Sequence, residues 1–128
     1  MRRFLTFIAL LFSAIVFSMG NQPSGNAFIP AKLIDKEGKT HKVNSIVCDD
    51  RTYFSFKDGA VEVKVPFEKI KKIVVLSQKG DFLEVEVTFK DGNKRKFLIS
   101  SDVSCSGVTA YGTVEATLQD LKEIQFLD

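Results

Sequence analysis

Residues 61–76 read Val-Glu-Val-Lys-Val-Pro-Phe-Glu-Lys-Ile-Lys-Lys-Ile-Val-Val-Leu and carry the clearest structural pattern in the chain. Apolar and charged residues alternate through Val61–Val65. This period of two predicts a half-buried β-strand, because successive side chains leave opposite faces of the pleat. Pro66 has no N–H to donate to a sheet, so the strand should end or bend there. Residues 66–71 are expected to form one short helical turn, and residues 73–77 the next strand.

Short strands separated by turn signals account for most of the remaining chain. Phe82–Phe89 alternates almost as cleanly, and the Asp-Gly pairs at 58–59 and 91–92 are typical of tight hairpins. No segment has an apolar stripe long enough for a globular helix. The sequence therefore predicts an all-β fold, a small antiparallel sandwich or partly closed barrel of about eight or nine short strands. The expected strands are 31–35, 40–48, 53–56, 61–65, 73–77, 82–89, 94–100, 114–118 and 124–127, with 108–111 as a weaker candidate.

Two pairs of segments resemble each other within the chain. Residues 36–43 align with 90–97 at an offset of 54, and residues 65–73 align with 116–124 at an offset of 51. Two interpretations are open. One is a duplicated β-unit whose halves face each other around a pseudo-two-fold axis, and the other is the likeness that any series of hairpins produces. The matched apolar positions are Phe67, Ile70 and Ile73 in one segment and Leu118, Leu121 and Ile124 in the other.

The N-terminal segment is typical of a secretory signal peptide. Arg2 and Arg3 precede an apolar run over residues 4–17, and the small residues Ser18 and Gly20 predict cleavage after Gly20. The run is shorter than the roughly 20 residues that span a bilayer, so cleavage is favoured over a retained anchor. We expect a signal peptide over 1–20, a mobile leader over 21–27 and a single β domain over 28–128, without a stable membrane span after cleavage and located in the periplasm or outside the cell.

Cleavage would change the net charge. The whole chain has 18 Lys and Arg residues against 16 Asp and Glu residues, and removing Arg2 and Arg3 leaves 16 of each. A neutral domain lacks the broad positive surface on which nucleic-acid binding depends, so we exclude that class. The corner with Lys69, Lys71 and Lys72 could meet an anionic lipid or glycan, although nearby acidic residues balance its charge.

The two cysteines are the next candidates for a structural role. An even number of cysteines in an exported chain predicts a disulfide between Cys48 and Cys105, because the compartments outside the cytoplasm are oxidising. They lie between the matched segments, near equivalent positions of the two halves. The alternative is a pair of free buried thiols.

The chain offers no constellation that is typical of catalysis. Nucleophilic Ser or Cys residues usually need a neighbouring base, and His41 is the only histidine. It follows a predicted turn beside lysines, so a surface position is expected. One histidine and two distant cysteines do not match the ligand spacing of a structural zinc site. We therefore expect no catalytic residues, no metal and no cofactor, and a small hydrolase based on His41 is the weakest alternative.

Residues 100–113 form the longest stretch without a clear core pattern. Long loops on rigid β scaffolds often carry binding sites, although a disulfide-pinned crossover between the halves explains this stretch equally well. We expect an exported, non-catalytic binding or assembly module of the cell envelope, with an envelope protein or a glycan as its partner. A structural or self-associating envelope protein is the alternative. The candidate binding-loop residues are Ser101, Ser104, Ser106, Thr109 and Tyr111.

Overall fold

The computed structural model describes residues 28–127. Within this range the chain is built almost entirely of antiparallel strands, which confirms the predicted all-β class. More strands form than the eight or nine expected, because residues 40–48 divide into two strands and residues 104–109 form another. The strands are β1 Ala31–Asp35, β2 Thr40–Val43, β3 Ile46–Cys48, β4 Tyr53–Asp58, β5 Val61–Pro66, β6 Ile70–Lys79, β7 Phe82–Phe89, β8 Lys94–Ser100, β9 Ser104–Thr109, β10 Gly112–Thr117 and β11 Leu121–Phe126.

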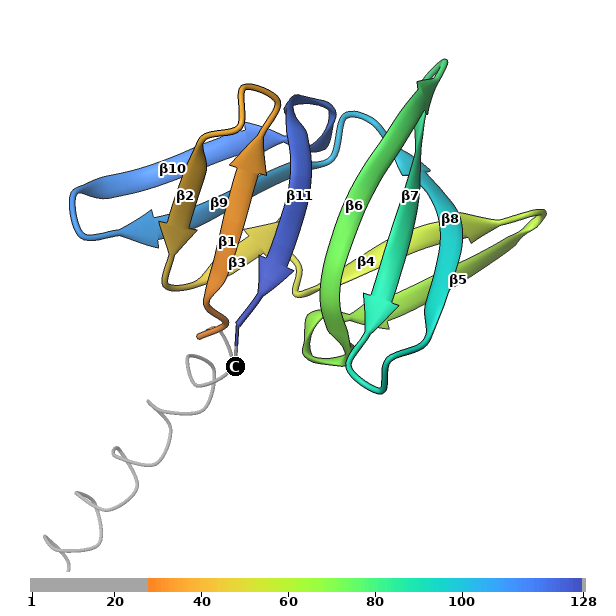
Figure 1. Ribbon diagram of the computed structural model, residues 1–128, viewed down its shortest axis with the longest axis horizontal. Helices are drawn as coiled ribbons and strands as arrows, with labels where there is room; N and C mark the ends of the chain where they lie inside the picture. The colour runs from red at the N-terminus through yellow and green to blue at the C-terminus, as the bar shows by residue number, and fades with distance from the viewer. Residues whose placement is uncertain (1–27, 128) are drawn as a thin grey trace, which may run out of the picture.

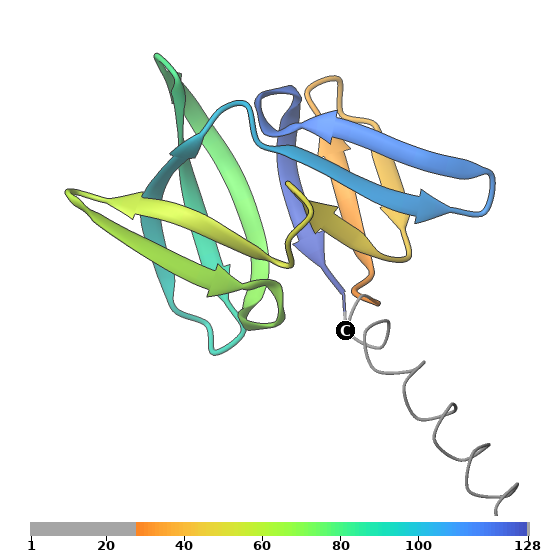
Figure 2. The ribbon, with the colours of Figure 1, turned by 180° about the vertical axis from the view of Figure 1, so that it is seen from behind.

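The strands form two lobes that lie side by side (Figure 1). Strands β4 to β8 make up the insert lobe, residues 53–100. Strands β1 to β3 and β9 to β11 make up the terminal lobe, so the insert lobe interrupts it in sequence. One eight-stranded sheet, in the order β2-β1-β11-β6-β7-β8-β4-β5, runs through both lobes without closing. A three-stranded sheet, β10-β9-β3, completes the terminal lobe, as the view from behind shows (Figure 2).

The two lobes meet where β6 pairs with β11, and their backbones repeat each other. Ile73 lies opposite Ile124 in this pairing, and these two residues occupy the same position in the matched sequence segments. In the insert lobe the N–H of Phe67 donates to the carbonyl of Thr52. In the terminal lobe the N–H of Leu118 donates to the carbonyl of Val103. These two residues lie 51 positions after Phe67 and Thr52. These repeated bonds support the duplicated-unit interpretation, with a permuted order in which the chain's first strands complete its last ones.

A short 3-10 helix forms the corner of each lobe. The first, Phe67–Lys69, follows Pro66 and lies within the predicted helical turn. The second, Leu118–Asp120, occupies the matching place before β11. Phe67 and Leu118 are fully buried, so each corner fixes one large side chain in the core.

The cores of the lobes differ in kind. The insert lobe stacks Phe56 on Phe97 with ring centroids 4.9 Å apart, within a cluster of aromatic rings. At the offsets of 51 and 54, Phe56 corresponds to Gly107 and Phe97 to Val43. A Cβ atom on Gly107 would lie 2.6 Å from the Cβ of Val43, so the strands approach closely where the insert lobe holds two rings. The remaining rings of the aromatic cluster are those of Phe54, Phe67 and Phe126.

The cysteine pair lies within the terminal lobe. Cys48 on β3 is directly opposite Cys105 on β9, and their sulfur atoms are 2.06 Å apart, the distance of a disulfide bond, as predicted. The expectation that they hold equivalent positions in two halves is wrong, because the counterpart of Cys105 is Phe54, 51 residues earlier. The bond lies beside both connections to the insert lobe, residues 49–52 and 101–103.

Residues 100–113 do not form the long loop that was expected. β9 runs through Ser104–Thr109 and a tight hairpin leads directly into β10. The strand has no visible apolar pattern because the residues it buries are Cys105 and Gly107, which are small.

The expected signal peptide and leader, residues 1–27, lie outside the described residues. Within residues 28–127 the structure contains no helix whose length and apolar character would let it cross a bilayer.

Candidate functional site

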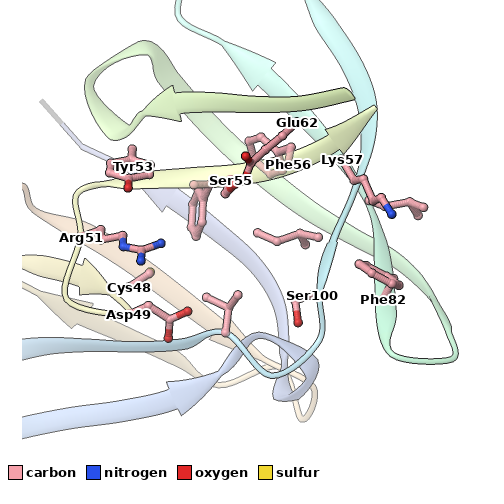
Figure 3. Close-up of a pocket in the computed structure, with 14 residues that line it drawn as sticks. Cys48, Asp49, Arg51, Tyr53, Ser55, Phe56, Lys57, Glu62, Phe82 and Ser100 are labelled. Carbon is pink, nitrogen blue, oxygen red and sulfur yellow. Dashed lines mark hydrogen bonds between the residues drawn. The ribbon is translucent and has the colours of Figure 1, made fainter. Parts of the chain in front are cut away.

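A cleft of about 410 Å³ opens beside the junction of the lobes, and we call it the interlobe cleft (Figure 3). Phe54 and Phe56 of β4 line it and are almost fully buried, so they supply apolar surface at its base. The alternation of β4 turns both rings to the same face of the strand. Other lining residues come from β5, β7, β8 and the two connections between the lobes, which are far apart in sequence.

Cations cover the more exposed aromatic rings of the interlobe cleft. The guanidinium carbon of Arg51 lies 5.6 Å from the centroid of the Tyr53 ring, within the range of a cation–π contact. At the other end, the Lys57 ammonium lies 5.2 Å from the centroid of Phe82. Figure 3 shows Arg51 and Tyr53 at the end near Cys48, and Lys57 and Phe82 at the opposite end. Each end of the cleft therefore presents an aromatic ring and a positive charge.

Hydroxyl and carboxylate groups complete the walls of the cleft. The Ser55 hydroxyl donates a hydrogen bond to Glu62 on the neighbouring strand β5. The Ser100 hydroxyl donates to the carboxylate of Asp102 at 2.6 Å. An apolar base surrounded by a few polar groups is typical of ligand sites, because the base supplies burial and the polar groups fix orientation.

A two-residue turn holds Arg51 at the mouth of the cleft. The backbones of Cys48 and Arg51 exchange two hydrogen bonds of 2.9 and 3.0 Å, and the residues between them, Asp49 and Asp50, have φ values of +53° and +61°. Such left-handed pairs are characteristic of tight hairpin turns, and aspartate tolerates them better than most residues. The Asp49 carboxylate also accepts the N–H of Ser104 at 3.1 Å, which fixes the turn to β9.

The residues predicted from sequence as a binding loop do not come together. Ser101 is nearly buried at the end of β8, whereas Tyr111 is exposed at the distant tip of the β9–β10 hairpin. Thr109 also lies at this tip, and its hydroxyl accepts two backbone N–H groups and donates to the carbonyl of Gly112. Ser104 and Ser106 lie along β9 between the two ends. The sequence did identify the short strand Tyr53–Phe56, but not that its aromatic residues line a cleft.

His41 forms a contact within its own hairpin. Its Nε2 lies 3.0 Å from the carboxylate of Asp35, and both side chains are partly exposed. The hydrogen bond from His41 holds the pKa of Asp35 below its ordinary value, with a further contribution from the N–H of Lys39. The structure therefore gives His41 a structural partner at the end of the β1–β2 hairpin.

Potential metal ligands are scattered through residues 28–127. There, no three His, Cys, Asp or Glu side chains lie close enough together to hold a metal ion. The interlobe cleft instead offers aromatic rings, two cations and hydrogen-bonding groups, which suit an organic ligand or a segment of a protein.

Comparison with known proteins gives a family but no activity. A family model described as "Uncharacterised protein" matches residues 26–128. An "Uncharacterized protein" of Aquifex aeolicus (strain VF5) is 30% identical over 122 residues, which cover 95% of this chain and 92% of that protein. Neither description names a catalytic activity.

A solved structure resembles the fold. It is the crystal structure of a protein from Vibrio parahaemolyticus, determined by a structural genomics consortium, with a TM-score of 0.58 and 10% sequence identity. The match covers 77% of this chain and 49% of that protein, so this chain spans about half of its length. At this identity the likeness concerns the fold alone.

Proposed function

The chain belongs to a family of proteins described as uncharacterised, and from its N-terminal sequence and the interlobe cleft we propose that it is an exported, non-catalytic binding module of the cell envelope. The interlobe cleft is its binding site. A segment of a partner protein places an apolar side chain on the base formed by Phe54 and Phe56, and its polar groups meet the rim. The observation that carries this proposal is the aromatic base between two cation-covered rings.

The rim favours a peptide as the ligand. Arg51 and Lys57 lie at opposite ends of the cleft, and Glu62 lies on its wall, so charges of both signs surround the apolar base. A peptide with one apolar side chain between two acidic residues would complement the positive ends, and a basic group beside them would meet Glu62. A glycan could stack on the same rings, and the test below separates the two.

Site-specific photo-crosslinking in the native envelope tests the proposal. A benzophenone amino acid replaces Ser100, which lines the cleft, and the control carries it at the exposed Lys122 on β11. We expect a discrete adduct from position 100 only, and a lower yield when Tyr53→Ala is added. Mass spectrometry of the digested adduct distinguishes the two, because a protein partner leaves a foreign peptide on the fragment that contains position 100, whereas a glycan leaves sugar masses. Equal adducts from both positions, or none from position 100, would contradict binding in the cleft.

A second candidate function is self-association through strand edges. β5 and β10 each pair on one side only, and they hold matching places in the two lobes. Exposed strand edges are ready to pair with another chain. Pairing of β5 in one molecule with β10 in the next would add molecules in a row. Light scattering after size exclusion distinguishes this candidate, because a monomer at all concentrations would exclude it.

A further inference from the structure

A second site lies on the sheet face where the lobes are joined. We propose that it binds a phosphate group, either of a soluble ligand or of a lipid headgroup. A cavity of about 450 Å³ opens there, and most of its lining residues come from β6, β7, β8 and β11. These four strands are neighbours in the sheet (Figure 1). We call this cavity the phosphate site. It shares no residue with the interlobe cleft, so the proposal does not depend on the proposed function.

Four side chains of the phosphate site form one row across the sheet. Gln125 pairs with Lys72, Lys72 with Thr88, and Thr88 with Lys94. Residues directly opposite each other in antiparallel strands point to the same face, so two ammonium groups, a hydroxyl and an amide lie along one line. The amide of Gln125 already donates to the carboxylate of Glu123 at 2.8 Å, so the lysines and Thr88 are the groups left for a ligand. The register of β6 shifts between Ile70 and Lys72, which leaves Lys71 as an extra residue that also lines the cavity.

Thr88 lacks the hydrogen bond that its burial calls for. The residue is 7% exposed, and its hydroxyl oxygen has no hydrogen-bond partner among the described residues. A buried hydroxyl without a partner costs roughly 1–3 kcal/mol, and an apolar side chain of the same shape would avoid that cost. An oxyanion in the adjoining cavity would accept a hydrogen bond from this hydroxyl after the side chains that cover its oxygen rearrange.

The lysines of the phosphate site also lack acidic partners. Within residues 28–127 no ion pair joins Lys71, Lys72 or Lys94 to a carboxylate. The lining of the cavity contains no aspartate or glutamate. Three nearby positive charges favour a ligand with more than one negative charge, and lysine is a common phosphate binder.

The duplication provides an internal comparison. In the terminal lobe the corresponding row is Val74, Glu123, Ile34 and Thr40, joined by the same register. Ile34 is therefore the counterpart of Thr88, and Glu123 is the counterpart of Lys72. The backbone forms equally well around an apolar and acidic row, so the fold itself does not require the hydroxyl or the lysines.

The test is a titration of isotope-labelled protein with inorganic phosphate at constant ionic strength, followed by the amide resonances. We expect saturable shifts at the amides of Lys72, Thr88 and Lys94, and none with chloride. Lys72→Gln and Thr88→Val should each weaken binding about tenfold, the loss expected for one hydrogen bond to a charged group. Lys122→Gln, at the position equivalent to Lys71, should leave the affinity unchanged.

Vesicles distinguish the source of the phosphate group. Binding to phosphatidylcholine vesicles that contain phosphatidic acid, lost in Lys72→Gln, would assign a lipid headgroup. Binding of inorganic phosphate without vesicle binding would assign a soluble ligand. Shifts equal to those with chloride, or equal weakening by Lys72→Gln and Lys122→Gln, would overturn the proposal.

Discussion

Gly107 shows how a single missing side chain sets the spacing of strands in the terminal lobe. Glycine fits at this position of β9 because it has no Cβ atom. A Cβ atom here would lie 2.6 to 2.8 Å from three side-chain carbon atoms of Val43. Its counterpart Phe56 fills the same place in the insert lobe with a stacked ring. The duplicated backbone thus accepts opposite solutions, a close approach in one lobe and a pair of rings in the other.

Gly107→Ala should therefore destabilise the protein by about 1–3 kcal/mol, the usual cost of overpacking a core. Urea unfolding measures the change. Ser106→Ala, next along β9 on its other face, is the matched control and should change stability by less than about 0.5 kcal/mol. Equal effects of the two variants would show that β9 and β2 can separate freely at this point.

At the scale of elements, the β1–β2 hairpin depends on one carboxylate. Asp35 accepts the N–H groups of Glu37 and Lys39 at 2.9 and 3.0 Å, and its other oxygen meets His41. Two backbone hydrogen bonds close this hairpin, and bonds between the residues 54 positions later close the β7–β8 hairpin in the same way. In that second hairpin Phe89 stands in the place of Asp35, so the carboxylate contacts are an addition to a shared backbone.

The pH dependence of stability should report this carboxylate. The pKa of Asp35 is lower in the folded chain than its ordinary value of 3.8. Its contribution is therefore present above the unfolded pKa and is lost as the pH falls through the folded pKa. We expect the urea midpoint of the wild type to fall between about pH 5 and pH 2, and Asp35→Asn to fall less. His41→Asn should lie between them. An identical slope in Asp35→Asn would exclude this carboxylate as a source of acid sensitivity.

The elements that could be predicted from sequence are those with an apolar period or a turn of typical composition. The hairpins at 36–43 and 90–97, and the corner after Pro66, satisfy both conditions. β9 could not be predicted, because its buried residues Cys105 and Gly107 lack apolar bulk. The interlobe cleft could not be predicted either, since distant segments contribute ordinary residue types to it. The turn at Asp49 and Asp50 lacks the glycine that usually marks such geometry.

The corner lysines illustrate the same limit at the phosphate site. Lys71 and Lys72 are visible in the sequence as a basic cluster balanced by nearby acids. Only the register of the sheet places Thr88 and Lys94 beside them and leaves the acidic residues outside the cavity. Charge counted along a segment therefore underestimates charge gathered across strands.

At the scale of the whole molecule, two similar lobes share one sheet but are stabilised differently. The insert lobe has an aromatic core, and Phe126 of β11 packs on Phe54 and Phe67 across the junction. In the terminal lobe, Cys105 and Gly107 stand at the positions of Phe54 and Phe56, and Cys105 forms the disulfide with Cys48. Cys48 and Cys105 are almost completely buried and flank the two connections to the insert lobe, so the bond also closes the base of that insertion.

Replacing both cysteines by alanine should therefore weaken the terminal lobe first. The bond spans a sequence separation of 57 residues, and the entropy of closing such a loop corresponds to roughly 4 kcal/mol. Urea unfolding of Cys48→Ala/Cys105→Ala measures the total loss, and hydrogen exchange locates it. We expect the amides of β9 and β10 to lose protection while those of β7 keep it, because the aromatic core of the insert lobe is untouched. An equal loss of protection in both lobes would instead mean that the two lobes, joined by the pairing of β6 with β11, unfold as one cooperative unit.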